Sequence, residues 1–304
     1  MSDSLNSEVM EFVNCNLCGS NSVINFMKVN GFNIVKCKKC GLAYVNPRLK
    51  EKKLHEIYNK EYFENPALTG SNASFCGYGE YLEEKANIQA TFSKRLKTID
   101  KFSEKGRLLD IGCAFGFFLE LAKEDGWDAK GLEISNHAYK YAKGKLKLHV
   151  INQTLEKAGF KSNSFDVVVL FDVIEHLQDP KSSLKEVRRI LKPNGLLVIT
   201  TPDIGSITAK VLWKNWEEVK RVREHIYFFS KDTLKKLLKS LNFKILKTES
   251  AGRFFSVESA INRGKLYNKA IFTVIGKLAD TLRLKKKNIY VDPHYKITVY
   301  ARKA

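Results

Sequence analysis

A short apolar run followed at once by closely spaced small residues most constrains how this 304-residue chain can fold. Residues Arg107–Ile111 have the length of a buried strand. Gly112, Ala114 and Gly116 follow, and a helical pattern of apolar residues then covers 117–122. Small residues let the backbone approach a ligand closely, and the start of a helix offers free N–H groups. This order of strand, tight turn and helix predicts an open α/β sheet with a ligand at the turn.

The carboxylate at the strand tip selects among ligands. The glycine spacing alone is weak evidence, because dinucleotide-binding loops share it. Asp110 stands two residues before Gly112 and would repel a pyrophosphate. It suits a ligand that carries an ammonium and a sulfonium group and no phosphate. S-adenosylmethionine (SAM) is such a ligand, and we expect it here.

A second acidic residue falls at the end of the next predicted strand, 127–133. Glu133 comes 21 residues after Gly112, the spacing at which a carboxylate binds ribose hydroxyls in Rossmann-type sheets. The alternative is that Glu133 caps the helix that begins near Ser135. With Asp110 and the glycine loop in place, we favour ribose binding.

A third strand signal follows at 164–171, a continuous apolar run typical of a strand covered on both faces. Asp179 and Pro180 then have the residue types of a helix N-cap and first turn. The next strand is expected at Leu196–Thr201.

Four segments in order resemble the class I SAM-dependent methyltransferases, in particular the ubiquinone-biosynthesis-like and sugar-tailoring branch. They are 108–116, 164–168, 174–180 and 191–202, and the resemblance covers roughly 106–243 and a final strand. It implies a Rossmann-like, doubly wound, mainly parallel seven-stranded sheet whose last strand is antiparallel. One departure is Ala114, where many members have glycine.

The resemblance also assigns roles by position. The residues expected around the methionine part of SAM are Asp110, Gly112, Ala114 and Gly116. Glu133 would hold the ribose, and Thr154 and Leu155, after a strand at Leu146–Ile151, would touch the adenine. Phe171 and Asp172 would lie beside the cofactor. An aromatic segment at 47–105 is expected as a helical lid, and Tyr78, between two glycines, is its candidate cofactor contact. All these positions fall at carboxyl ends of strands or in the lid.

Two histidines are candidates for a catalytic base. His176 follows the strand that ends at Phe171, and His225 precedes a helix opened by Ser230. Methyl transfer needs alignment first and a base only for a hydroxyl or weakly acidic C–H acceptor. The alternative is that each is a structural histidine bonded to Glu175 or Glu224.

Two CxxC pairs predict a metal site near the start of the chain. Cys15, Cys18, Cys37 and Cys40 have the spacing of paired zinc knuckles, and a glycine follows each pair. Four thiolates form a closed, structural zinc site. A β-hairpin around Asn30-Gly31 is expected between the pairs, so we assign 1–46 to a zinc ribbon. The redox alternative for CxxC lacks a βαβ context.

Composition bears on partners and location. The net charge is +19, but 41 of the 52 basic residues are lysines spread along the chain, whereas nucleic-acid readers favour arginine and aromatic platforms. This makes a nucleic-acid acceptor less favoured, and the resemblance to sugar-tailoring methyltransferases implies a small-molecule, nucleotide-sugar, glycan or lipid-linked acceptor. An RNA methyltransferase and a non-catalytic SAM-binding protein are the alternatives. Paired cysteines, the absence of a secretory apolar segment and the absence of an 18-residue apolar run indicate a cytoplasmic protein.

An unusual segment interrupts the end of the predicted methyltransferase domain, 106–304. A helical insertion is expected at about 254–290, between strands Phe243–Glu249 and Lys296–Ala301, which should pair antiparallel. Apolar residues recur every four positions in Gly264–Lys287, and lysines end it. We favour packing over the substrate pocket or against a second subunit. The alternative is contact with an anionic membrane surface, which would make the protein peripheral to a membrane.

Overall fold

The computed structural model describes residues 9–51, 53, 81–82, 84–265, 268–285 and 287–304. A seven-stranded sheet in the order β12-β15-β10-β9-β6-β7-β8 forms its centre. The bounds of the strands, in chain order, are β6 Arg107–Ile111, β7 Asp128–Leu132, β8 Val150–Ile151, β9 Phe165–Phe171, β10 Leu191–Pro202, β12 Phe243–Ser250 and β15 Lys296–Lys303. The last strand, β15, runs antiparallel to both neighbours, β10 and β12, as predicted.

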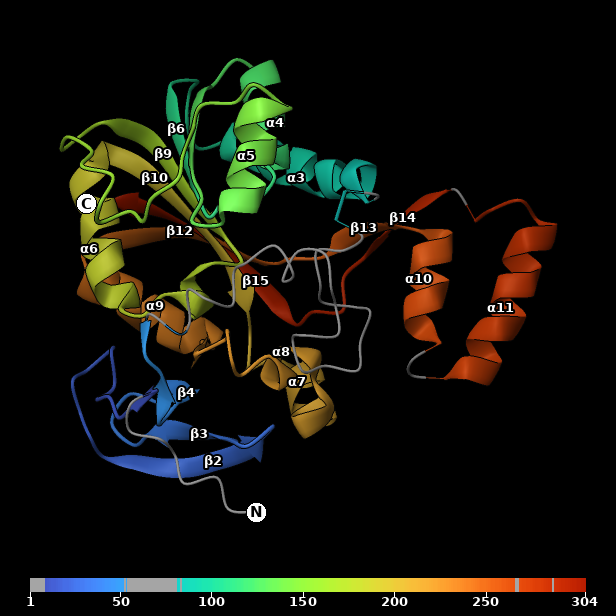
Figure 1. Ribbon diagram of the computed structural model, residues 1–304, viewed down its shortest axis with the longest axis horizontal. Helices are drawn as coiled ribbons and strands as arrows, with labels where there is room; N and C mark the ends of the chain where they lie inside the picture. The colour runs from blue at the N-terminus through green and yellow to red at the C-terminus, as the bar shows by residue number, and fades with distance from the viewer. Residues whose placement is uncertain (1–8, 52, 54–80, 83, 266–267, 286) are drawn as a thin grey trace.

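Helices cover both faces of this sheet (Figure 1). They are α3 Lys85–Ile99, α4 Phe117–Glu124 and α5 Asn136–Gly144 on one face, and α6 Pro180–Ile190 and α9 Lys231–Ser240 on the other. Because successive strand residues point to opposite faces, Leu108 and Val169 pack with the first group, while Leu109 and Leu170 pack with the second. The sequence-based prediction of a doubly wound sheet is confirmed.

Local signals in the sequence fix where several elements begin. Asp179 is the N-cap of α6 and accepts a hydrogen bond from the Ser182 backbone N–H. Ser230 opens α9 with a reciprocal capping box. Asn30 and Gly31 both adopt positive φ between β2 and β3, the conformation of a type I′ hairpin turn. All three features were predicted.

The cysteine module contains a four-stranded sheet that another part of the chain completes. Its order is β11-β4-β3-β2. The bounds are β2 Val23–Val29, β3 Phe32–Cys37, β4 Ala43–Val45 and β11 Tyr227–Phe228. A further pair, β1 Met10–Glu11 and β5 Arg48–Leu49, lies nearby in sequence. Since β11 lies more than 170 residues after the module, the ribbon shares a sheet with the methyltransferase region.

A projecting arm separates β12 from β15 (Figure 1). It consists of β13 Arg253–Ser256, α10 Val257–Gly264, α11 Lys269–Thr281 and β14 Asn288–Val291, with β13 paired to β14. The prediction of one continuous helical stripe over Gly264–Lys287 is wrong in one respect. The helix of this stripe begins only after Asn268, whose side chain caps it.

Two short helices complete the described part of the chain, α7 Ile207–Leu212 and α8 Glu217–Lys220. None of the helices in the described ranges combines the length and apolar character that crossing a bilayer requires. Tyr78 lies outside the described residues, as do residues 52, 54–80 and 83 of the predicted lid.

Candidate functional site

A cavity of about 390 Å³ lies at the carboxyl ends of β6, β7 and β9. This is the edge at which open α/β sheets bind ligands. Its wall contains seven of the residues singled out from the sequence: Gly112, Ala114, Glu133, Thr154, Leu155, Asp172 and His176. Ile134, Gln153 and Val173, which were not singled out, also line it. The volume is within the usual range for small-molecule sites.

The turn after β6 has the backbone shape that small residues permit. Gly112 and Ala114 both have positive φ, 72° and 48°. A Cβ on Gly112 would lie 2.6 Å from Cγ2 of Val173. Gly112 therefore lets this turn lie against the segment after β9, and both contribute to the cavity wall.

Gly116 has a different reason for being glycine. Its φ is 82°, and an added Cβ would meet the side chains of Leu148 at 2.6 Å and Ala142 at 3.2 Å. It is not among the residues that line the cavity. The close packing of α4 against α5 and the following segment requires glycine here, which the sequence-based assignment to the methionine site did not foresee.

Phe171 also faces away from the cavity. Its neighbour Leu170 lines the cavity, so the alternation of the strand turns Phe171 to the other face. There its ring lies 4.9 Å from that of Phe118 and 5.5 Å from that of Phe92, with the guanidinium of Arg95 over it at 4.9 Å. Only Asp172 of the predicted pair lines the cavity.

Asp110 and Glu133 form a buried acidic pair behind the glycine turn. Asp110 is 3% exposed. Burial, and then the charge of Glu133, raise its pKa well above the usual value. Glu133 accepts hydrogen bonds from the backbone N–H groups of Ala114 at 2.8 Å and Ser135 at 2.7 Å. Burial nevertheless raises the pKa of Glu133.

The contacts of Glu133 fit both roles considered for it from the sequence, helix capping and ligand binding. Its bond to Ser135, the N-cap residue of α5, is the capping role. Its bond to Ala114 fixes the glycine turn, while the residue still lines the cavity. Within the described ranges, no basic side chain contributes to the pKa shift of Asp110 or of Glu133. A cationic ligand at this edge would therefore stabilise their ionised forms.

The two candidate histidines lie together. Their ring centroids are 4.6 Å apart and nearly perpendicular. His176 lines the cavity and is half-buried, whereas His225 is 2% exposed and is not among the lining residues. Burial and the charge of Arg221 lower the pKa of His176 to about 3 and that of His225 well below its usual value. Both imidazoles are therefore neutral near pH 7.

The hydrogen-bond partners of these histidines differ from those expected. His176 Nδ1 lies 3.0 Å from the backbone oxygen of Glu224. His225 Nδ1 lies 3.5 Å from a carboxylate oxygen of Glu218, while Glu175 accepts a bond from Thr201. These contacts therefore differ from the expected hydrogen bonds between the two histidines and the carboxylates of Glu175 or Glu224.

Glu175 adds a carboxyl group to the histidine pair. Burial and the charge of Asp172 raise its pKa to about 8. One of its oxygens is buried without a hydrogen-bond partner. Ligand atoms of Glu175, His176 and His225 lie within 4.8 Å of one another. This cluster can exchange a proton, and its donor set also has the composition of a divalent-cation site.

Sequence reasoning missed the lysine that holds Asp172. Lys296 Nζ lies 2.9 Å from Asp172 and 3.7 Å from Glu218. Burial alone would lower the pKa of Lys296, but these carboxylates raise it. Burial would raise the pKa of Asp172, but the charges of Lys296 and Arg95 hold it below its usual value. The pair is 124 residues apart in sequence, and only the antiparallel pairing of β15 with β10 brings it together.

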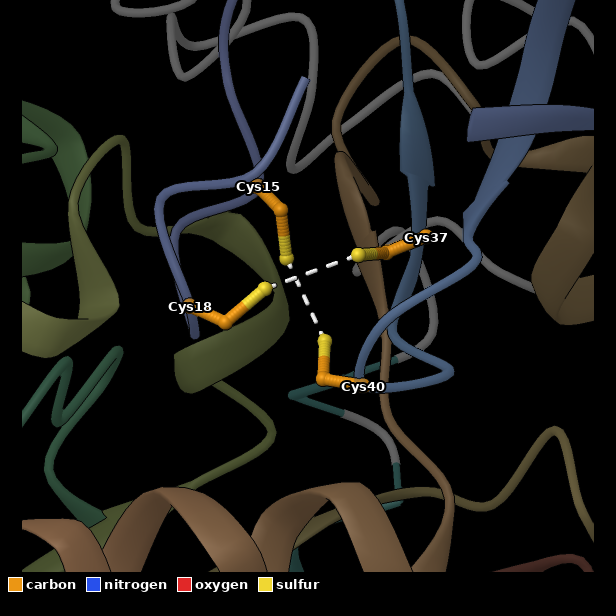
Figure 2. Close-up of side chains that lie close together, drawn as sticks. All are labelled: Cys15, Cys18, Cys37 and Cys40. Carbon is orange, nitrogen blue, oxygen red and sulfur yellow. Dashed lines mark hydrogen bonds between the residues drawn. The ribbon is translucent and has the colours of Figure 1, made fainter. Parts of the chain in front are cut away.

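The four cysteines form a compact cluster (Figure 2). Their side chains converge from two loops, with Sγ–Sγ distances of 3.4 Å for Cys15–Cys40 and 3.5 Å for Cys18–Cys37. All four sulfur atoms lie within 4.8 Å of one another. A tetrahedral zinc ion with Zn–S bonds of about 2.3 Å would set its sulfurs roughly 3.8 Å apart, so the arrangement is compatible with a zinc ribbon.

Backbone N–H groups around the cluster favour thiolates, but burial outweighs them at Cys15 and Cys40 and raises the pKa of both thiols. Gly19 and Gly41 have φ of 74° and 86°, which turns the loops as predicted. Burial would raise the pKa of Cys37, but backbone N–H groups of Cys40 and Lys39 lower it to about 7. The described cysteines are free of disulfides.

The first cysteine loop also touches the cavity wall. Asn16, inside the first CxxC, donates to Asp179 at 2.7 Å and accepts from the Lys181 backbone N–H at 2.9 Å. Asp179 lines the cavity. From the ribbon sheet, Val45 N–H donates to Ile226, whose own N–H donates to Glu175. The ribbon is therefore hydrogen-bonded to two parts of the site.

The sequence around this cavity matches a known protein family. The model of a methyltransferase domain family matches residues 78–248. This range contains the glycine turn, Glu133 and both candidate histidines.

Two relatives illustrate the sequence likeness. The uncharacterized protein MJ1123 of Methanocaldococcus jannaschii is 27% identical over 171 residues, covering 56% of this chain and 78% of that protein. A ubiquinone biosynthesis O-methyltransferase of Cereibacter sphaeroides is 30% identical over 173 residues, covering 55% of this chain. The match spans only 62% of the length of that enzyme.

Two solved structures share the fold. Magnesium protoporphyrin IX methyltransferase from Synechocystis PCC 6803, with bound SAH, superposes with a TM-score of 0.54 at 14% identity, covering 84% of this chain and all of that one. A SAM-dependent methyltransferase from Thermotoga maritima, described as a possible histamine N-methyltransferase, gives 0.51 at 21% identity, covering 75% and 96%. At these identities the likeness establishes the fold.

Proposed function

Since this chain belongs to the methyltransferase domain family and is a SAM-dependent methyltransferase, we propose that it methylates a hydroxyl oxygen on a small-molecule, sugar or lipid-linked acceptor. The observation that carries the proposal is the position of His176. It shares one cavity wall with the glycine turn and with Glu133.

The tautomer of His176 suits a proton acceptor. The backbone oxygen of Glu224 can only accept, so Nδ1 of His176 carries the hydrogen of their 3.0 Å contact. Nε2 then carries the lone pair. The lowered pKa, about 3, keeps the ring neutral at neutral pH, and it also makes Nε2 a weaker base than an ordinary imidazole. His225, packed edge-on against this ring, acts as a positioning residue.

SAM supplies a methyl group on a positively charged sulfur. The acceptor oxygen forms a bond to the methyl carbon, the carbon–sulfur bond breaks with its electrons left on sulfur, and S-adenosylhomocysteine leaves. The hydroxyl proton passes to Nε2 of His176. The chain contributes alignment and one proton acceptor.

Residues of the cavity edge can hold SAM. Gly112 and Ala114 let the backbone lie close to the methionine part, near the buried Asp110. Glu133, Thr154 and Leu155 all line the cavity; in this proposal Glu133 holds the ribose, and Thr154 and Leu155 contact the adenine. The two unusually buried acidic groups fit a ligand that brings positive charge, since a cation stabilises their ionised forms.

Two considerations support a hydroxyl acceptor. Relatives named as ubiquinone biosynthesis O-methyltransferases match over 55% of this chain. A neutral imidazole at the cavity wall also serves a hydroxyl, which must lose its proton, better than an acceptor that is already a strong nucleophile.

We also propose that Cys15, Cys18, Cys37 and Cys40 hold one structural zinc ion. The convergence of four sulfurs supports this, and four protein ligands leave no open position for chemistry. The ion would stabilise a module that has a small core of its own.

Methyl-label transfer from SAM tests the proposal. Purified chain is incubated with labelled SAM and, separately, with nucleotide sugars, glycolipids, phenols or total RNA. We expect label in a hydroxyl-bearing small molecule or glycan and not in RNA. His176→Ala should lower turnover by about 10²–10⁴-fold while SAM affinity stays within a few-fold.

Matched variants separate the roles of the two histidines. His176→Gln keeps a donor for the Glu224 oxygen but cannot accept the proton, so it should be as slow as His176→Ala. His225→Ala should slow turnover less than His176→Ala does. Turnover within about tenfold of wild type in both His176 variants would mean that the enzyme works by positioning alone.

A further inference from the structure

The projecting arm carries an apolar face that the described chain leaves uncovered. On α11, five apolar side chains are exposed: Ile271, Val274, Ile275, Leu278 and Leu282. Val274 is 68% and Leu278 60% exposed. At 100° per residue these positions occupy one continuous stripe of the helix.

The face of α11 next to the stripe, and not the stripe itself, carries the packing within the arm. Ala279 is 6% exposed. A Cβ on Gly276 would lie 3.4 Å from Ile261 of α10, and one on Gly264 would lie 2.1 Å from the ring of Phe272. Small residues therefore bring α10 and α11 close together on that side, and the larger aliphatic side chains point elsewhere.

Among the described residues, the arm does not contribute to the cavity wall, over which it was expected to pack as one of two alternatives. The residues that line the cavity come from 51, 111–134, 153–157 and 170–183. Residues of the arm, 253–291, are not among them. In Figure 1 both helices extend beyond the sheet, connected to it by β13 and β14.

The charge of the arm indicates what covers the stripe. Between residues 253 and 291 the sequence has nine basic and two acidic residues, a net charge of +7. Of the two acidic residues, Asp280 lies 3.0 Å from Lys285. Lys269 and Lys277 on α11 and Arg283 and Lys287 after it are exposed.

We propose that α11 binds the surface of a bilayer that contains anionic lipids, with its apolar stripe in the interface. Apolar residues on one helical face with flanking lysines are the pattern of interfacial helices, and anionic headgroups attract clustered basic residues. A second copy of this chain fits less well, because a two-fold contact would bring +7 against +7.

Vesicle sedimentation with the full chain tests this. At low ionic strength we expect binding to vesicles of phosphatidylcholine mixed with phosphatidylglycerol and weak binding to phosphatidylcholine alone. Val274→Ser with Leu278→Ser should weaken binding by about tenfold or more. Lys269→Gln with Lys277→Gln should weaken it severalfold and reduce its dependence on salt.

A control pair matches the apolar change elsewhere. Phe12 and Ile24 on the N-terminal module are 78% and 47% exposed, and Phe12→Ser with Ile24→Ser should leave vesicle binding unchanged. SAM affinity should be unchanged in every variant, which also shows that each one is folded.

Three results would overturn the proposal. They are no binding to phosphatidylglycerol vesicles, equal binding by the Val274→Ser, Leu278→Ser variant, or a dimer in sedimentation velocity that this variant converts to a monomer. None of them concerns methyl transfer, so the lipid proposal and the proposed function fail separately.

Discussion

At the residue scale, the acidic groups behind the glycine turn are the most unusual feature of the cavity. Asp110 and Glu133 are buried side by side, each with a raised pKa. An uncompensated pair of this kind costs stability, and a cationic ligand offsets that cost. The same reasoning explains why a dinucleotide would not suit the turn.

Substitutions at this turn should remove SAM binding. Asp110→Ala deletes the carboxyl group, and we expect affinity to fall by more than about tenfold. Gly112→Val places a side chain where φ is +72° and Val173 lies 2.6 Å from the added Cβ, so binding should be lost. Isothermal titration measures both.

Gly126→Val is the matched control. Gly126 also has positive φ, 90°, but nothing lies within 4 Å of an added Cβ. It should lose stability from backbone strain and keep SAM affinity. Unchanged affinity in Asp110→Ala or Gly112→Val would contradict the assigned cofactor site.

His176 should make stability depend on pH in a predictable direction. Its pKa is about 3 in the folded chain and about 6.5 when unfolded. The folded state therefore binds fewer protons below pH 6.5, and stability is lost as the pH falls through this window. His176→Gln lacks the effect. Between pH 7.5 and 5.5, wild type should lose about 1 kcal/mol relative to the variant in urea unfolding. Parallel pH dependences would disprove this.

At the element scale, the cysteine loops should depend on metal. We expect one zinc ion per chain by elemental analysis and none in Cys37→Ser. That variant should lose structure in the N-terminal module, because thiolate ligation stabilises it, while SAM binding stays measurable. Lys38→Ser, an exposed change in the same loop, should keep the ion. Zinc-free wild-type protein purified without chelator would refute the proposal.

Much of the fold at this scale could be predicted, because the signals are local. The glycine turn, the Asp179 cap and the Asn30-Gly31 hairpin each depend on neighbouring residues, and each was found. The arm was located between the correct strands. Its helix break was missed because apolar periodicity continues through the turn, where Asn268 starts a new helix.

The parts of the site that could not be predicted depend on distant contacts. Lys296 reaches Asp172 only through strand pairing. Glu218 is close to His225 in sequence, but it contacts the imidazole only because the chain turns back after α8. Phe171 was predicted to lie beside the cofactor but is not among the residues that line the cavity, because one residue of strand register decides between cavity and core. Gly116 looked like a ligand contact but meets Leu148 and Ala142.

At the scale of the whole molecule, Arg48 connects three regions. It lies 2.9 Å from Glu11, and it donates to the backbone oxygen of Gln178 at 2.8 Å and to the Tyr227 hydroxyl at 2.9 Å. Arg48→Ala should destabilise the chain by about 2–3 kcal/mol, because buried acceptors lose a charged donor. Thermal unfolding measures this. The exposed Lys97→Ala should change stability by less than about 0.5 kcal/mol, and equal effects would argue against the connection.

The shared sheet of the ribbon gives the chain a chemical vulnerability far from its cavity. Strand β11 pairs with β4 of the ribbon, and the adjoining Ile226 is hydrogen-bonded to Glu175 beside His176. With zinc bound as proposed above, oxidation of the cysteines or a shortage of the metal would loosen the loop that leads from Cys40 into β4. The wall that carries the histidines would then lose its support. Methylation would thereby respond to the supply of metal and to oxidative stress, although neither acts on the acceptor or on SAM.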